Sequence, residues 1–201
     1  MPRGNIRLDT YKLLSFDKIS STQDYAHDLI ARGDAHNKTI IQALAQSAGR
    51  GRYRRTWVSH GNLYASFIYK TTERDPKLSY AVAVAIAETL IALGMMPEIK
   101  WPNDVLIKGK KISGVLIEYS QSFVIIGIGI NIKTCPTVKE YKTTKINNFV
   151  KDADINNVLG ILIKEMDKWR KVNFLTVRER WMDLAAALNK VIQYHGKPAE
   201  L

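Results

Sequence analysis

The sequence predicts a protein of the α+β class, in which strands and helices pack around one core. Short apolar runs bounded by turn residues recur along the chain, as is typical of buried strands. An alanine-rich segment, 76–93, and an amphipathic segment, 155–169, have the length and spacing of helices. Lys108-Gly109-Lys110 separates two apolar runs and is the signal of a tight hairpin, which indicates antiparallel pairing.

Six apolar runs are expected to form the main strands. Each is rich in aliphatic, β-branched or aromatic residues. In chain order they are 11–16, 39–44, 63–69, 105–107, 112–117 and 123–132. The last two are joined by a turn at 120–122, so we expect them to pair with each other. A further strand begins near Asn189.

Four segments carry helix signals. Ser21 and Thr22 are suited to cap the first helix, and glycines at 33 and 94 end the first and the second. Asp154 is suited to cap the third, whose apolar residues recur at the i, i+3, i+4 and i+7 spacing of an amphipathic helix. The expected helices span about 22–32, 76–93, 155–169 and 174–188.

The most unusual stretch runs from Gln46 to Trp57 and follows the second expected strand. It places two glycines and four arginines within seven residues, 49–55. The glycines allow a tight turn and close approach to a ligand, and the guanidinium groups match phosphate or carboxylate oxygens. Because the four cations repel one another, we expect this loop to be mobile when empty and to order around an anion. On this stretch alone, a solvated basic loop or a nucleic-acid-binding segment stays open.

Composition narrows the class of protein. At 201 residues, with 46% apolar and 24% charged residues, the chain is an ordinary globular domain with room for a small appendage. A formal net charge of +11 suggests an acidic partner, such as a nucleic acid, a nucleotide or an acidic protein. The single cysteine, Cys135, fits a reducing compartment, so we expect a cytoplasmic protein, and no stretch has the length of a membrane span. The histidines lack metal-ligand spacing, so no metal site is expected.

Four blocks of the sequence together resemble the catalytic domain of the biotin protein ligases. They are Ser21-Thr22-Gln23; Gln46 through Gly-Arg-Gly-Arg to Trp57; Lys100-Trp101-Pro102-Asn103-Asp104 with Lys111-Ile112-Ser113-Gly114; and Gly127-Ile128-Gly129-Ile130-Asn131. The blocks follow that family's order and approximate spacing. The last block lacks the third glycine and the following helix of a dinucleotide-binding loop, so we reject that interpretation.

The resemblance implies a fold and a reaction. The fold is a mixed central β-sheet flanked by helices, shared with lipoyl ligases and class II aminoacyl-tRNA synthetases. In the reaction, ATP and biotin give biotinyl-5'-AMP and pyrophosphate with Mg²⁺. The ε-amine of a lysine on a biotin carboxyl carrier protein or domain then takes the biotinyl group and releases AMP. The expected small molecules are thus ATP, biotin and Mg²⁺, and the carrier is the expected partner of a monomer or homodimer.

Site residues follow by matching each motif of the family to this sequence. The resemblance assigns catalysis to Lys111, Arg50 and Asp104, with Lys111 as a protonated stabiliser and Asp104 orienting or deprotonating the acceptor lysine. Biotin binding is expected from Ser21, Thr22, Gln23, Gln46, Arg50, Gly51, Arg52, Lys111, Gly114 and Gly129. Nucleotide binding is expected from Arg52, Arg55, Trp57, Asn103, Lys111 and Asn131. The backbone at Gly114 and Gly129 would let the bicyclic ring of biotin approach closely.

The resemblance also bears on domain organisation. About ten residues precede the first expected strand, so we expect a monofunctional form without the family's DNA-binding domain and without specific DNA binding. We expect the catalytic domain over residues 1–188 and a stub over 189–201, with the SH3-like C-terminal domain absent or truncated. Arg54 stands where the family commonly has a small residue. Two alternatives stay open: a lipoyl or octanoyl ligase on the same scaffold, and a non-catalytic nucleic-acid-binding module.

Overall fold

The computed structural model describes residues 4–8, 10–52, 55–57, 60–101, 103–186, 191–194 and 197–200. Its main sheet has eight strands in the order β1-β2-β3-β4-β8-β7-β6-β5. β2 and β3 run parallel, and the other neighbouring pairs of this sheet are antiparallel. The mixed central sheet expected from the resemblance is therefore confirmed.

The six expected strands are all present in this sheet. Its strands are Gly4–Leu8 (β1), Tyr11–Ile19 (β2), Thr39–Gln46 (β3), His60–Lys70 (β4), Pro97–Lys100 (β5), Asp104–Ile107 (β6), Lys110–Ser120 (β7) and Phe123–Ile130 (β8). The two that the sequence did not predict, β1 and β5, are short and lie at the two edges. Val191–Tyr194 (β9) and Lys197–Glu200 (β10) form a separate two-stranded sheet.

The four expected helices are present as well. They are Thr22–Ala31 (α1), Leu78–Ala92 (α2), Ile155–Trp169 (α3) and Phe174–Asp183 (α4), with a short 3-10 turn at Ile146–Asn148. The side chains of Ser21 and Asp154 cap α1 and α3 as predicted. Within the described residues α4 is shorter than the prediction, because the backbone after it bonds to the edge strand β5: the Ile99 N–H donates to the Leu184 carbonyl.

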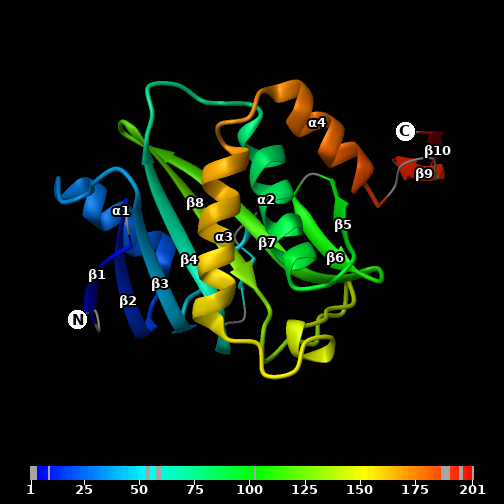
Figure 1. The fold of residues 1–201 in the computed structure, drawn as a ribbon, viewed down its shortest axis with the longest axis horizontal. Coiled ribbons are helices and arrows are strands. Elements are labelled where there is room, and N and C mark those ends of the chain that lie inside the picture. Colours follow the sequence, from blue (N-terminus) through cyan, green and yellow to red (C-terminus); the bar gives the residue numbers. More distant parts are fainter. Residues whose placement is uncertain are drawn as a thin grey trace.

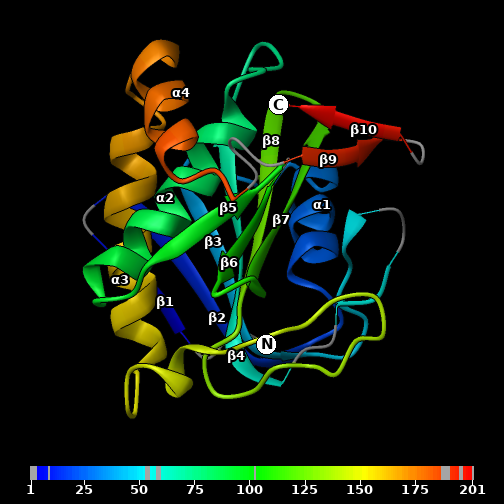
Figure 2. The ribbon, with the colours of Figure 1, turned by 90° about the vertical axis from the view of Figure 1, so that its right-hand side faces the viewer.

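The helices divide between the two faces of the sheet (Figures 1 and 2). α2, α3 and α4 cover one face over a large apolar core, in which Phe67, Ile86 and Leu90 are fully buried. α1 lies on the other face, where Ala26 and Ile30 pack on a smaller cluster from β2, β3, β4 and β8. The neighbouring part of this second face, over β4, β8 and β7, carries the polar residues and glycines of the site described below.

The parallel pair explains why two separate motifs meet. A parallel connection needs a crossover, which α1 supplies between β2 and β3. Both strands therefore end at the same edge of the sheet, where Ile19 is the register partner of Gln46. The start of α1 directly follows β2, so Ser21 and Thr22 lie beside the end of β3.

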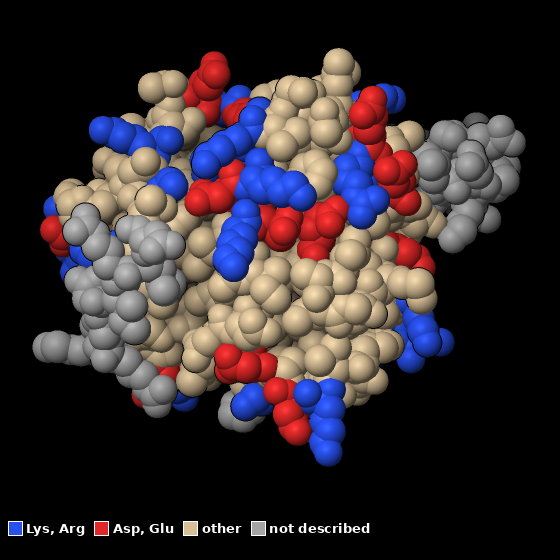
Figure 3. Space-filling view, in the orientation of Figure 1, with Lys and Arg blue, Asp and Glu red and all other residues tan. Residues whose placement is uncertain are grey.

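The helix-covered face carries charges of both signs (Figure 3). Arg180 pairs with Glu88 at 2.6 Å, and Lys168 lies 3.8 Å from Glu165. On this face the described basic side chains are thus interspersed with acidic ones. In the part of the chain that the structure describes, none of the helices has the length and apolar character needed to span a membrane.

Candidate functional site

A cavity of about 160 Å³ lies between the start of α1, the arginine-rich stretch 46–57, here called the basic loop, and strands β4, β8 and β7. All predicted site residues except Asn131 line it. Eight lining residues were not predicted: Thr56, Tyr64, Ser66, Val115, Leu116, Gly127, Ile128 and Tyr141. Ser66 carried a usable signal, since it is a polar residue in an otherwise apolar strand, whereas Tyr141 lies in a loop without periodicity.

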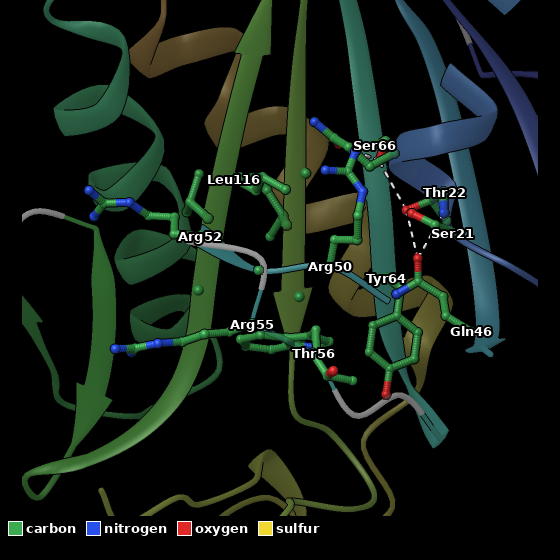
Figure 4. A pocket seen from close by; sticks show the side chains of 18 of the residues that line it. Ser21, Thr22, Gln46, Arg50, Arg52, Arg55, Thr56, Tyr64, Ser66 and Leu116 are labelled. Atoms are coloured by element: carbon green, nitrogen blue, oxygen red, sulfur yellow. Dashed lines mark hydrogen bonds between the residues drawn. The ribbon is translucent and has the colours of Figure 1, made fainter. Parts of the chain in front are cut away.

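One end of the cavity is polar and uncharged. The backbone N–H and the Oγ1 of Thr22 both donate to Oε1 of Gln46, at 2.8 and 3.1 Å. Ser66 Oγ lies 3.0 Å from Thr22 Oγ1 and 2.9 Å from Oε1 of Gln23. Ser21, Thr22, Gln23 and Ser66 are all buried. These side chains therefore form a preorganised set of donors and acceptors, linked across three elements (Figure 4).

Glycines form the floor of the cavity. Gly129 of β8 is the register partner of Gly114 in β7, and Gly127 is paired with Leu116. A Cβ atom on Gly129 would lie only 2.6 Å from the Trp57 ring, and one on Gly127 would lie 2.6 Å from Oε1 of Gln23. The close approach expected at Gly114 and Gly129 is thus made in this structure by the indole of Trp57.

The ammonium of Lys111 also lines the cavity. It forms a 2.7 Å ion pair with Asp104 and lies 5.5 and 5.1 Å from the ring centroids of Trp57 and Tyr141. Burial, and then the charge of Asp104, raise the pKa of Tyr141. The β6–β7 hairpin thus brings Asp104 beside Lys111.

The turn of this hairpin has the predicted chemistry. Lys108 and Gly109 have φ angles of +50° and +69°, the left-handed pair that a two-residue hairpin turn requires. Glycine adopts this conformation without strain, which explains its place after Lys108. The turn sets the register of β6 against β7 and so determines which side chains of the two strands meet in the cavity.

The arginines of the basic loop point in different directions (Figure 4). Arg52 and Arg55 extend to the same side, and Arg52 donates to Oδ1 of Asn103 at 3.1 Å. Arg50 turns to the other side, where Asp24 and Glu118 bind its guanidinium. The charge of Arg50 is therefore offset by two carboxylates of the protein, which reduces the repulsion among the cations of the loop. Arg54 lies outside the described residues.

Asn131 is the one predicted residue that the structure does not bring to the cavity. Asn131 is buried and does not line the cavity, and its Nδ2 donates to the Thr144 carbonyl at 3.0 Å. The Thr144 N–H in turn donates to the carbonyl of Lys111. Asn131 thus holds the segment that carries Tyr141 against β7, and its nucleotide contact stays a prediction.

The chain is similar to several known proteins. Residues 15–133 match the family model of the biotin/lipoate A/B protein ligase family. The bifunctional ligase/repressor BirA of Bacillus spizizenii is 43% identical over 131 residues, 60% of this chain and 40% of the relative. The biotin–[acetyl-CoA-carboxylase] ligase of Mycobacterium tuberculosis is 29% identical over 78% of this chain and 66% of its own length.

Solved structures share the fold. The biotin protein ligase of Aquifex aeolicus in complex with biotin and ATP has a TM-score of 0.80 and 27% identity, covering 94% of this chain and 86% of that one. The match to the Bacillus relatives spans only about two fifths of their length, 40% and 41%. The match to the family model, over residues 15–133, includes the four blocks on which the resemblance stands.

Proposed function

The chain belongs to the biotin/lipoate A/B protein ligase family, and from this premise we propose that it is an ATP-dependent biotin ligase. It forms biotinyl-5'-AMP and transfers the biotinyl group to a lysine of a biotin carboxyl carrier protein or domain. One observation carries the proposal: a single cavity joins a neutral hydrogen-bonding end, at Thr22 and Gln46, to a cationic end at Lys111. The biotin and ATP bound in the similar Aquifex aeolicus ligase support it.

The cationic part of the cavity suits the two reacting acids, and the neutral part suits the ureido ring of biotin. The carboxylate of biotin must approach the α-phosphate of ATP, and both are anionic. The ammonium of Lys111 and the guanidinium groups of Arg52 and Arg55 offset their repulsion and the charge that develops between them. The neutral ureido ring takes hydrogen bonds from the buried set around Ser21, Thr22 and Gln46.

Ligand binding requires movement of the loop. The cavity of about 160 Å³ is smaller than the roughly 300 Å³ at the lower end of small-molecule sites. The indole of Trp57 takes up the room above Gly114 and Gly129. We infer that Trp57 shifts when biotin enters and then closes over it, which keeps water from the mixed anhydride.

The transfer step uses the ion pair between Asp104 and Lys111. Before the substrates bind, the carboxylate of Asp104 is the counterion of Lys111 at 2.7 Å. Once the acyl phosphate takes over Lys111, Asp104 is released to orient the acceptor amine and accept its proton. The neutral amine attacks the acyl carbon, an amide bond forms, and AMP leaves with the electrons of the broken acyl–oxygen bond.

Among the described residues, few carboxylates are placed to hold Mg²⁺. Within the described ranges, no group of three or more His, Cys, Asp or Glu side chains is placed to bind a metal ion. Of the cavity residues, Asp104 carries a carboxylate, and it is already paired with Lys111. Mg²⁺ would therefore arrive on the phosphates of ATP as part of the substrate, as it commonly does in nucleotide sites.

Further points of the proposal concern the setting of the enzyme. Residues 1–188 are proposed as the catalytic domain, supported by the fact that β9 and β10 form a sheet of their own. We propose a cytoplasmic protein, in keeping with its single cysteine. Acidic carriers would suit the net charge of +11, which would accelerate their encounter.

The test combines the protein with biotin, Mg-ATP and a biotin carrier domain, and follows the mass of the carrier. We expect the mass to rise by one biotinyl group, and to stay unchanged when the acceptor lysine of the carrier is replaced. Biotin-dependent exchange between pyrophosphate and ATP measures the first step by itself. No product with several genuine acceptors, together with no exchange, would contradict the proposal.

The same assay separates the alternatives. Lipoate or octanoate would outcompete biotin if the protein were a lipoyl ligase. Salt-dependent binding of DNA or RNA that persists at about 150 mM salt, with no affinity for biotin, would favour the nucleic-acid-binding module.

A further inference from the structure

Glu118, in β7, binds the side chain of Arg50 from the basic loop and that of His27 from α1. Its Oε1 and Oε2 accept hydrogen bonds from Nη1 and Nη2 of Arg50, at 3.0 and 3.1 Å. Nε2 of His27 in α1 lies 2.9 Å from Oε2. Asp24, also in α1, accepts from Nε of Arg50 at 2.7 Å. The planar guanidinium is thus bound along two edges, with the bidentate geometry that makes arginine–carboxylate pairs strong.

This carboxylate clamp, formed by Glu118 and Asp24, lies outside the cavity, because neither residue is among its lining. The hydrogen bonds that Arg50 donates raise its pKa, the one to Glu118 most of all. Partial burial opposes the charge of Glu118, but hydrogen bonds from Arg50, His27 and Gln23 outweigh it and hold the pKa of Glu118 below its ordinary value of 4.5. Arg50 and Glu118 are therefore both charged near neutral pH.

The backbone of Arg50 connects the clamp to the cavity. Arg50 and Thr56 form an antiparallel bridge, and the Trp57 N–H donates to the Gly49 carbonyl at 2.8 Å. The backbone at Gly49 and Arg50 is thus hydrogen-bonded to the backbone at Thr56 and Trp57. Holding the side chain of Arg50 therefore tethers the backbone at Trp57, so that the indole can shift to admit biotin and still close over it.

We propose that Glu118 is a positioning residue, which acts through Arg50 to tether the basic loop so that Trp57 closes over biotin once biotin has entered the cavity. The inference rests on the proposed function and gives Arg50 a different part in it. Its guanidinium anchors the loop, while Lys111, Arg52 and Arg55 face the reacting anions. The clamp gives one of the clustered cations, Arg50, counter-charges from the protein itself.

The test replaces Glu118 by glutamine, which keeps the size of the side chain and removes its charge. In biotin-dependent pyrophosphate exchange, we expect KM for biotin to rise about tenfold, equivalent to about 1.4 kcal/mol of lost binding, while kcat changes less than about threefold. In an Arg50→Gln background, the same substitution is expected to add almost nothing, because its partner is already gone.

The matched control is Glu88→Gln. Glu88 is a partly buried carboxylate that receives a 2.6 Å hydrogen bond from Arg180 on the opposite face of the sheet. The Glu88→Gln substitution removes an arginine–carboxylate pair on the face of the sheet opposite to the basic loop. We expect it to lower stability without changing KM for biotin. If both variants raise KM equally, the effect is a general loss of stability and the proposal is overturned.

A second readout needs no activity. In a Trp101→Phe background, Trp57 becomes the most accessible indole, because Trp169 and Trp181 are only 6% and 8% exposed. We expect acrylamide to quench the emission of Trp57 more strongly in Glu118→Gln than in its parent. Unchanged quenching with unchanged KM would refute the clamp. A protein that lacks exchange activity altogether would refute the proposed function, while the quenching result would still decide the role of Glu118.

Discussion

At the scale of single residues, the cations around the cavity divide into two groups. Arg50 is bound by carboxylates of the protein, whereas Lys111 combines one counterion, Asp104, with two aromatic rings. The side chain of Lys111 is only 15% exposed, so its charge acts in a partly dehydrated setting where electrostatic stabilisation is strong. This arrangement makes Lys111 the residue whose removal should affect chemistry most directly.

Lys111→Ala is therefore expected to lower kcat for pyrophosphate exchange by about 100-fold or more, the usual cost of removing one group that stabilises a developing charge. The melting temperature should change little, because Asp104 remains 33% exposed and is hydrated without its partner. Lys110→Ala, at an exposed position of the same hairpin, is the control and should keep nearly the wild-type rate. A Lys111→Ala enzyme with half of the wild-type rate would disprove this role.

At the scale of elements, β8 shows how a strand is adapted to what lies on it. In its second half glycines alternate with isoleucines, so one face is bare there while the other fills the core. The bare face accepts Gln23 from α1 at Gly127 and Trp57 from the basic loop at Gly129. The strand thus gives up side-chain packing on one face in exchange for close approach by two functional segments.

Gly129→Ala should displace Trp57, because the added Cβ would lie 2.6 to 2.8 Å from atoms of its ring. We expect calorimetry to show biotin affinity reduced by about tenfold or more, in line with the cost of overpacking a filled site. Gly160→Ala in α3 is the control, since nothing lies within 4 Å of its Cβ position. It should leave biotin binding unchanged and stabilise the protein by about 0.5–1 kcal/mol. Equal affinity in both variants would rule out the displacement.

At the scale of the whole molecule, the sheet separates stability from function. The large core lies on the face covered by α2, α3 and α4, and the site lies on the face of α1 (Figure 2). Charged residues of the site can therefore change with pH while the main core stays intact. Glu118 ties α1, the basic loop and β7 together, so its ionisation should contribute to the stability of the fold as a whole.

The pH dependence of unfolding tests this contribution. The pKa of Glu118 is lower in the folded protein than its ordinary value of 4.5, so its charge stabilises the folded state at every pH above that value. The contribution is lost as the pH falls below 4.5 through the lowered pKa. In denaturant titrations, wild type should be more stable than Glu118→Gln at pH 7, and the difference should shrink in acid. A difference that grows in acid would contradict the assignment.

Much of the fold could be predicted because its signals are local. Helix caps at Ser21 and Asp154, the hairpin at Lys108 and Gly109 and the six apolar strands each depend on a few neighbouring residues. The edge strands β1 and β5 escaped prediction because their sequences, GNIRL and PEIK, contain no apolar run. α4 was overestimated because its continuation is stopped by hydrogen bonds to Ile99, a distant residue.

The sequence by itself determined the family resemblance and the order of the main elements. Of the fifteen site residues predicted from it, fourteen line the cavity. Only the tertiary structure decided that Arg50 is bound by Glu118, 68 residues away. It also decided that Tyr141 lies beside Lys111 and that Asn131 does not line the cavity. The reason is physical. Caps and periods are set within one or two turns of chain, whereas a pairing across the sheet depends on the register of several strands at once.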